Sequence, residues 1–279
     1  MKKFFPLLFA TLLAAPLVQA EEDHMVYHGK VEDDSEASDS TSGGTPVKNR
    51  YGNPVMVGGK PLMTRGTPKS SADLQQASGK GKHLVFLTGD EEYRGEEGLP
   101  MMAKILSQRH GFKCTVLFSL NDKGEIDPNN RKSLSNPKAL DNADAIIMLL
   151  RFRRWGDTTN KHFNAACNRG VPIIGLRTST HAFNGKLRGF GKRVLGEGWV
   201  SHWGGHKREA CRGVIEPGAE KDSILNGVTD VFADSDVYEA HPPKDVKILL
   251  RGLVLENMKP DSKPSTRDRK KDRPINDPA

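Results

Sequence analysis

Short apolar runs alternate with amphipathic stretches along the middle of the chain. Four runs rich in Val, Ile, Leu and Phe have the length and composition of buried strands; they span residues 83–90, 112–120, 143–151 and 171–177. Helices are predicted over 99–111, which ends at a glycine, and over 157–170, which Asp157 begins as the N-cap. Because helices separate near-continuous apolar strands, this order predicts an α/β domain with a doubly wound, mainly parallel sheet.

The segments on either side of this pattern are polar. Residues 21–82 are dominated by Ser, Gly, Asp, Pro and Lys, and no apolar period in them lasts more than a few residues. Residues 259–279 contain four prolines among alternating charges. Neither segment can bury enough apolar surface to offset the entropy of ordering the chain. We therefore expect a disordered linker at 21–82, a folded domain at 83–258 and a disordered basic tail at 259–279.

The first 20 residues have the form of a secretory signal peptide. Lys2 and Lys3 supply positive charge, residues 4–18 are mostly apolar, and Ala20 completes a small-x-small cleavage pattern. The apolar run is short for a bilayer, and no stop-transfer sequence follows it. The sequence therefore predicts export through a Sec-type signal peptide, a periplasmic or secreted location, and no stable membrane span in the mature chain.

The charge of the chain does not indicate nucleic-acid binding. Lys and Arg number 42 against 35 Asp and Glu, which gives a formal net charge of +7. Part of this excess lies in the signal peptide and in residues 259–279, and no basic stripe interleaved with aromatic residues is present. We expect a small-molecule partner and no nucleic acid, and the pattern defines no oligomeric state.

Cysteine usage excludes two further classes of site. Cys114, Cys167 and Cys211 are odd in number and none belongs to a CxxC pair, so neither a disulfide framework nor a cysteine metal knuckle is expected. Free cysteine packs as a small hydrophobic residue. Cys114 and Cys167 are therefore expected to fill the core of a strand and of a helix.

Polar residues follow three of the predicted strands, at 90–94, 151–155 and 175–181. In a doubly wound sheet, ligands bind beyond the carboxyl ends of the strands. Any one of these residues taken alone is equally well explained by a surface ion pair. Their clustering is what indicates a site at this edge of the sheet.

The segment Gly175–Ser179 has the setting of a nucleophile elbow, because it follows a strand and precedes a predicted helix. Arg177 occupies the presented position. A guanidinium is neither a nucleophile nor a base near neutral pH, so covalent acyl transfer of the Cys–His type is not expected. An arginine there is suited to hold a carboxylate, a phosphate or a sugar hydroxyl.

His202 and His206 are separated by a tryptophan and two glycines, which favours a tight loop over a helix. Three interpretations stay open. The imidazoles could act as general acid or base, or His202 could simply bond a backbone carbonyl. They could also share a divalent metal with a third ligand. Candidates for that ligand are Asp90, Glu91, Glu92 and His181.

Five segments resemble the ThuA-like (trehalose-utilisation) family in its planctomycete and verrucomicrobial form. They read KHLVFLTGDEEYRGEEGLPMMAKIL, ADAIIMLLRFRRW, GVPIIGLRTSTHAF, LGEGWVSHWGGHKREACRGVI and SDVYEAHPP. The resemblance implies a flavodoxin-like sheet of the class I glutamine amidotransferase-like superfamily without the cysteine nucleophile. Family members continue beyond a KPDSKP-like segment, so the resemblance also implies that this sheet lacks C-terminal strands and a helix.

The resemblance further implies a role in carbohydrate catabolism, on a saccharide that can be an oxidised one. The matching residues fall into a catalytic group, His202, His206 and Glu92, and a substrate-binding group, Glu91, Tyr93, Arg177, Thr178 and His181. Asp236 and Tyr238 match an acidic-tyrosine element. We expect a hydrolase or lyase and not a functional glutamine amidotransferase. The alternatives are a non-catalytic carbohydrate-binding or scaffold domain and a metal-dependent hydrolase.

Overall fold

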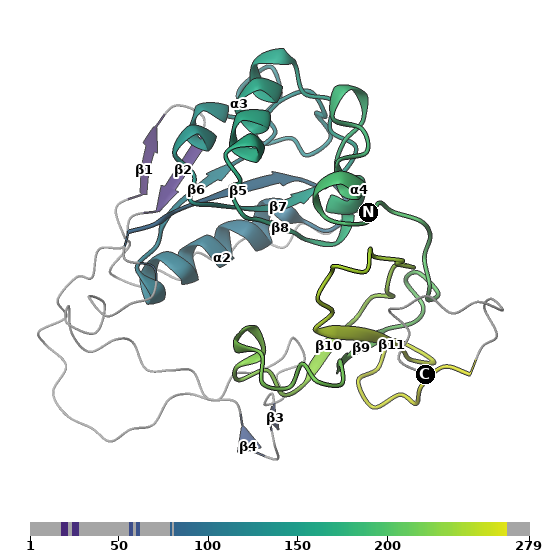
Figure 1. Cartoon of the computed structure of the whole chain (residues 1–279). Helices are drawn as coiled ribbons and strands as arrows, with labels where there is room; N and C mark the ends of the chain where they lie inside the picture. Colours follow the sequence, from purple (N-terminus) through teal and green to yellow (C-terminus); the bar gives the residue numbers. More distant parts are fainter. Residues whose placement is uncertain are drawn as a thin grey trace, which may run out of the picture. The chain divides into compact units, whose positions relative to one another are not determined.

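The structure, a computed structural model, describes residues 18–21, 24–27, 56–57, 60–61, 79 and 81–266 (Figure 1). The chain divides into two compact units, where the sequence predicted one domain at 83–258. The first consists of Met1–Thr41, Thr67–Met148 and Trp155–Ile174, and the second of Ser42–Gly66, Leu149–Arg154 and Gly175–Ala279. Among the described residues, no helix combines the length and the apolar character that crossing a membrane requires.

A parallel sheet of four strands forms the centre of the α/β fold. The strands are β5 (His83–Gly89), β6 (Lys113–Leu117), β7 (Ala145–Leu150) and β8 (Ile173–Gly175). They lie in the order β6-β5-β7-β8, and β5 pairs in parallel with β6 from His83↔Lys113 to Leu87↔Leu117. All four predicted strands are confirmed, each somewhat shorter than its apolar run.

Two helices cover opposite faces of this sheet (Figure 1): α2 (Gly95–His110) and α3 (Asp157–Asn168). The chain moves from β5 to β6 in one direction and from β7 to β8 in the other, so right-handed crossovers place the two helices on opposite sides. Helix α2 ends as predicted at Gly111, whose φ of 71° suits glycine. The predicted N-cap of α3 is corrected, because Gly156 is the cap and Asp157 lies in the first turn.

The core of the first unit is built from the apolar runs themselves. Val85 and Phe86 of β5 are fully buried, as are Ala103 of α2 and Phe163 of α3. Strands covered on both faces need such continuous apolar sequence, which is why these runs were recognisable. The packing expected for the cysteines is confirmed for Cys114, which is buried in β6. Cys167 in α3 is only partly buried.

Additional strands lie in segments that the sequence left without structure. β2 (His24–Tyr27) pairs antiparallel with β6 and with β1 (Val18–Glu21), and β3 (Met56–Val57) pairs with β4 (Lys60–Pro61). The prediction of a disordered linker at 21–82 did not anticipate these strands. Most of it, and residues 1–17 of the predicted signal peptide, lie outside the described residues.

The second unit contains an antiparallel sheet of three short strands. β9 (Cys211–Ile215) is central and pairs with β10 (Val231–Ala233) and β11 (Leu250–Val254). Its one α-helix within the described residues is α4 (Phe190–Val194). Short 3-10 helices are η1 (Pro137–Asn142) in the first unit and η2 (Arg177–His181), η3 (Gly185–Leu187) and η4 (Ser223–Leu225) in the second.

The beginning of the predicted tail is ordered. Pro264 forms an antiparallel bridge with Leu255, and the backbone N–H of Ser265 donates to the carbonyl of Val254 at the end of β11, 2.9 Å away. The prediction of disorder from residue 259 is therefore wrong for 259–266. Backbone hydrogen bonds hold this segment, and such bonds cannot be predicted from composition. Residues 267–279 lie outside the described residues.

Candidate functional site

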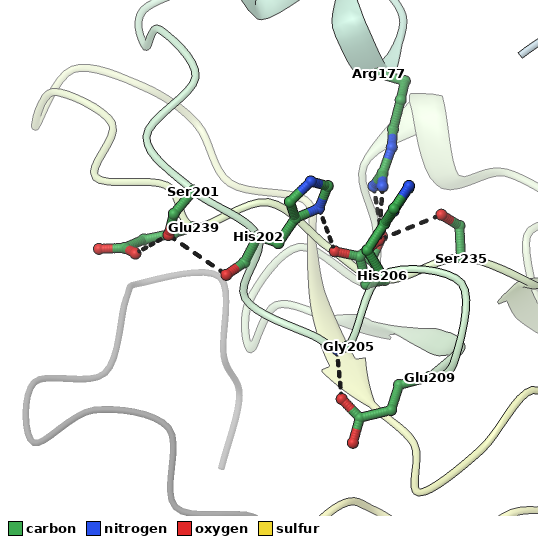
Figure 2. Close-up of polar contacts among 9 residues, drawn as sticks. Arg177, Ser201, His202, Gly205, His206, Glu209, Ser235 and Glu239 are labelled. Atoms are coloured by element: carbon green, nitrogen blue, oxygen red, sulfur yellow. Dashed lines mark hydrogen bonds and ion pairs between the residues drawn. The ribbon is translucent and has the colours of Figure 1, made fainter. Parts of the chain in front are cut away.

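Three charged or polar side chains of the second unit converge on the carboxylate of Asp236. His202 Nδ1 lies 2.7 Å from Oδ2, and His206 Nδ1 lies 3.2 Å from Oδ1. Arg177 donates from a guanidinium nitrogen to Oδ1 over 2.7 Å and from another to the backbone carbonyl of Asp236. Figure 2 shows Arg177, His202 and His206 pointing toward one another. The Asp236 side chain is fully buried, so these groups supply its hydrogen bonds in place of water.

A short antiparallel pairing brings these residues together. Residues 201–203 run beside residues 237–239, and His202 faces Tyr238 in an isolated bridge. The N–H of Trp203 donates to the carbonyl of Val237, and the N–H of Glu239 donates to the carbonyl of Ser201, both over 2.9 Å. Since Asp236 immediately precedes this pairing and follows β10, its carboxylate lies beside the His202 ring. His202 is in a loop, as the glycine-rich spacing predicted.

The loop between the two histidines is fixed by a buried carboxylate. Glu209 accepts a hydrogen bond from the backbone N–H of Gly205 and one of 3.1 Å from the Ser265 hydroxyl. Its side chain is inaccessible to solvent, with 3% of the residue surface exposed. A buried carboxylate with two donors holds its partners firmly. The position of His206, one residue after Gly205, therefore depends on Glu209.

Arg177 occupies the apex of the strand-to-helix turn, as predicted. It follows β8, begins η2, and has a φ of 42°, in the left-handed region that an elbow residue adopts. Its guanidinium carbon lies 4.0 Å from the centre of the Tyr238 ring while its nitrogens bond Asp236. The sequence assigned Arg177 to substrate. In the structure its guanidinium bonds a carboxylate of the protein, Asp236.

Asp236 is the electrostatic centre of the cluster. Burial of the carboxyl acts to raise its pKa, but hydrogen bonds from His206, Arg177 and His202, together with the guanidinium charge, outweigh burial and lower the pKa from its usual value of 3.8. The group is therefore ionised at neutral pH and its oxygens only accept hydrogen bonds. Each imidazole must then donate from Nδ1–H, which leaves Nε2 of a neutral ring as the proton acceptor.

His202, His206 and Asp236 form a cluster that could hold a metal ion. One ligand atom from each lies within 4.8 Å of the others. Bonds of about 2.0–2.1 Å to a tetrahedral ion place two ligand atoms about 3.3 Å apart. The separation of 3.2 Å at His206 suits this geometry, whereas 2.7 Å at His202 is a hydrogen bond. The guanidinium of Arg177 on the same carboxylate repels a cation, so the arrangement favours hydrogen bonding over metal binding.

The third member of the cluster was not among the predicted ligands. Asp90 accepts hydrogen bonds from the backbone N–H of Glu92 and Tyr93 at 2.8 and 3.2 Å, so its carboxylate closes the turn after β5. Glu91 forms an ion pair of 3.4 Å with Arg131. These residues belong to the first unit, and the histidine cluster belongs to the second. The one sequence signal for Asp236 was its place in the acidic-tyrosine element.

The remaining predicted binding residues differ in accessibility. Thr178 is buried, with 1% of its surface exposed, and so presents no open face to a ligand. His181 packs its ring against those of Phe152, Trp199 and Tyr238, with centroid distances of 5.1, 5.7 and 6.0 Å. His202 also contacts Trp199 and Tyr238. We call the five rings of Phe152, His181, Trp199, His202 and Tyr238 the aromatic cluster. Trp199 was not among the residues predicted from the sequence.

Cysteine chemistry at this site is disfavoured. Cys211 is buried, and desolvation raises the pKa of its thiol despite the nearby charge of Arg177. Burial also raises the pKa of Cys114, to about 12. A buried thiol with a raised pKa has little thiolate and is a poor nucleophile. The apex of the turn is Arg177, and the Cys211 thiol is buried with a raised pKa. The site therefore has no activated cysteine among these residues.

Comparisons of the chain with models of protein families, with curated proteins and with solved structures found no match.

Proposed function

We propose that this protein is an exported α/β domain of the ThuA-like type that acts on a saccharide, in an oxidised or unmodified form, through general acid–base catalysis by His202 and His206. The residue segments that resemble the family supply the substrate class. The strand order β6-β5-β7-β8, which matches the first four strands of a flavodoxin-like sheet, supports the family's fold.

The hydrogen bond between Asp236 and His202 Nδ1 carries the catalytic part of the proposal. A buried, ionised carboxylate 2.7 Å from Nδ1 fixes the tautomer and the orientation of the ring and stabilises the imidazolium that forms when Nε2 takes a proton. His202 is about one-third exposed, so Nε2 can reach a substrate. This arrangement makes His202 the general base.

His206 completes an acid–base pair. Its ring centroid lies 4.5 Å from that of His202, and both rings bond the same carboxylate. In hydrolysis the neutral ring removes a proton from water, and in elimination it removes one from a carbon next to a carbonyl. In both reactions the protonated ring gives its proton to the leaving oxygen. Hydrolase and lyase reactions use such a pair.

Arg177 has a positioning role in this mechanism. Arg177 compensates the charge of Asp236 and stacks on Tyr238, which keeps the carboxylate oriented between the histidines. A cysteine nucleophile has no place in it, because the apex residue is Arg177 and the Cys211 thiol is buried with a raised pKa. These observations support an activity different from glutamine hydrolysis.

Turnover of a saccharide panel by His202→Ala and His206→Ala tests the assignment. The panel contains unmodified and 3-keto disaccharides, with products separated by chromatography. We expect each variant to lose roughly 100- to 10,000-fold in rate. His162→Ala is the matched control, since His162 also bonds an aspartate, Asp141, over 2.7 Å but lies in the first unit. Unchanged turnover in His202→Ala contradicts the mechanism, and binding without product in the wild type supports a carbohydrate-binding domain instead.

A metal-dependent hydrolase is the second candidate, favoured by the convergence of three possible ligand atoms. A divalent ion held by His202, His206 and Asp236 would supply Lewis-acid polarisation of a bound oxygen. Elemental analysis of purified protein, followed by dialysis against a chelator and readdition of Zn²⁺ or Mn²⁺, distinguishes the two mechanisms. The acid–base mechanism predicts activity independent of this treatment, and the metal mechanism predicts loss and recovery.

A further inference from the structure

Trp199 is the exposed member of the three tryptophans. Its residue surface is 45% accessible, whereas Trp155 and Trp203 retain 6% and 4%. Val200 beside it is also exposed, at 43%. Large aromatic side chains that stay accessible next to polar groups are enriched at binding surfaces, because they offer apolar area with little conformational freedom to lose. Trp199 therefore offers accessible aromatic surface close to His202.

Three rings of the aromatic cluster hold the indole in place. The centroid of Trp199 lies 5.7 Å from His181, 5.9 Å from His202 and 6.4 Å from Tyr238. The corresponding interplanar angles are 65°, 75° and 86°, the edge-to-face geometry that aromatic pairs prefer. An indole in contact with three rings is preorganised beside His202, so a ligand that stacks on it loses little affinity to ordering the side chain.

The charges around the aromatic cluster disfavour a cationic ligand. The guanidinium of Arg151 lies over the Phe152 ring at 4.8 Å, and that of Arg177 over the Tyr238 ring at 4.0 Å. These cations already use two ring faces and repel a cationic ligand, which rules against an ammonium-binding cage. The saccharide of the proposed function is instead a ring with one apolar face and a hydroxylated rim. Its rim can bond the imidazole of His202 and the phenol of Tyr238.

We propose that Trp199 forms a subsite for the apolar C–H face of a pyranose ring, immediately beside His202. The inference rests on the proposed function, because it names how the saccharide is held while His202 acts on it. Stacking on the indole fixes the ring plane, and hydrogen bonds from the rim fix its rotation. Trp199 is in this way a substrate-binding residue rather than a packing residue.

Intrinsic fluorescence of the full chain tests the subsite. The exposed Trp199 dominates red-shifted emission, since the other two indoles are buried. Titration with disaccharides is expected to quench this emission saturably and shift it to shorter wavelength. No saturable change with any saccharide overturns the proposal.

Calorimetry on variants gives the second measurement. Trp199→Ala is expected to weaken saccharide affinity roughly tenfold and Trp199→Phe roughly threefold, because phenylalanine keeps part of the stacking face. Val200→Ala, an exposed neighbour outside the aromatic cluster, is the matched control and should bind like the wild type. Circular dichroism confirms that each variant is folded. Equal affinity in Trp199→Ala and the wild type overturns the subsite.

These results separate the subsite from the proposed function. If Trp199→Ala binds normally and His202→Ala loses turnover, the acid–base proposal survives and the subsite fails. If Trp199→Ala loses affinity while no product forms in the wild type, the subsite survives and the catalytic proposal fails. Stronger quenching by a planar aromatic ligand than by any saccharide contradicts the pyranose assignment.

Discussion

The backbone of Gly204 lies against the side chain of Asp236. A Cβ atom added at Gly204 would be 2.6 Å from the Asp236 Cβ and 3.2 Å from a methyl carbon of Val254. Neither neighbour is the end of a flexible side chain. Glycine at this position is therefore what lets the histidine loop approach the buried carboxylate closely enough for His202 and His206 to bond it.

Gly204→Ala tests this close approach. We expect a loss of about 1–3 kcal/mol in unfolding free energy, because the added methyl must push the loop away from Asp236. Saccharide turnover should fall with it, since both imidazoles move. Chemical denaturation measures the first effect. Gly198→Ala is the control, with open space at its Cβ and no left-handed φ, and equal stability of the two variants would show that the loop has room to adjust.

Arg177 and Asp236 should be energetically coupled. Arg177→Gln removes the guanidinium from a fully buried carboxylate, and we expect it to cost about 1–3 kcal/mol in unfolding free energy. Asp236→Asn removes the charge that Arg177 compensates. In a double-mutant cycle the combined loss should be smaller than the sum of the single losses. Strict additivity would mean that the ion pair contributes nothing beyond its separate parts.

Stability should fall in acid because of Asp236. Its pKa is lower in the folded protein than the usual 3.8 of an unfolded chain, so the folded state binds fewer protons and the stabilisation is complete above that value. It is lost as the pH falls below 3.8 through the pKa of the folded state. Denaturation curves between pH 6 and pH 2 should show a shallower decline in Asp236→Asn than in the wild type. Parallel declines would contradict this.

The tautomer of His202 should depend on Asp236. Nitrogen-15 NMR is expected to show Nδ1–H in the neutral ring of the wild type, because an ionised carboxylate can only accept. Asp236→Asn can offer an N–H instead, which permits the other tautomer. Turnover should then drop roughly 100- to 10,000-fold with little change in fold. A neutral His202 protonated on Nε2 in the wild type is the result that would refute the mechanism.

Thiol labelling should distinguish the three cysteines. Cys167 is partly exposed, whereas Cys114 and Cys211 are buried with raised pKa values. Under native conditions we expect one thiol to react readily with a disulfide reagent and three after denaturation. Peptide mapping should assign the fast thiol to Cys167. Rapid labelling of Cys211 would instead indicate an activated thiol near His206 and reopen a cysteine mechanism.

Much of the central sheet could be predicted from the sequence because its signals are local. A strand covered on both faces must be apolar throughout, and β5, β6, β7 and β8 each lie within a predicted apolar run. Gly111 was recognisable as a helix end for an equally local reason. The cap of α3 was misplaced by one residue, since an aspartate suits either the cap or the first turn.

The site was only partly predictable because its centre is non-local. His202 and His206 stood out by their spacing, and Arg177 by its place after a strand. Asp236 is 34 residues from His202 along the chain, and only the pairing of 201–203 with 237–239 makes them neighbours. Composition likewise could not reveal the ordered residues 259–266, because hydrogen bonds to β11 hold them.

By itself the sequence determined four strands of the central sheet, the two helices that cover it and the arginine at the elbow, since apolar period, capping residues and turn glycines act within a few residues. Only the tertiary structure decided what those groups do. It joined Asp236 to two imidazoles, placed Arg177 on that carboxylate, and left the indole of Trp199 exposed beside them. The physical reason is that hydrogen bonds and ring contacts depend on distance in space, which is set by strand pairing and packing across the whole unit.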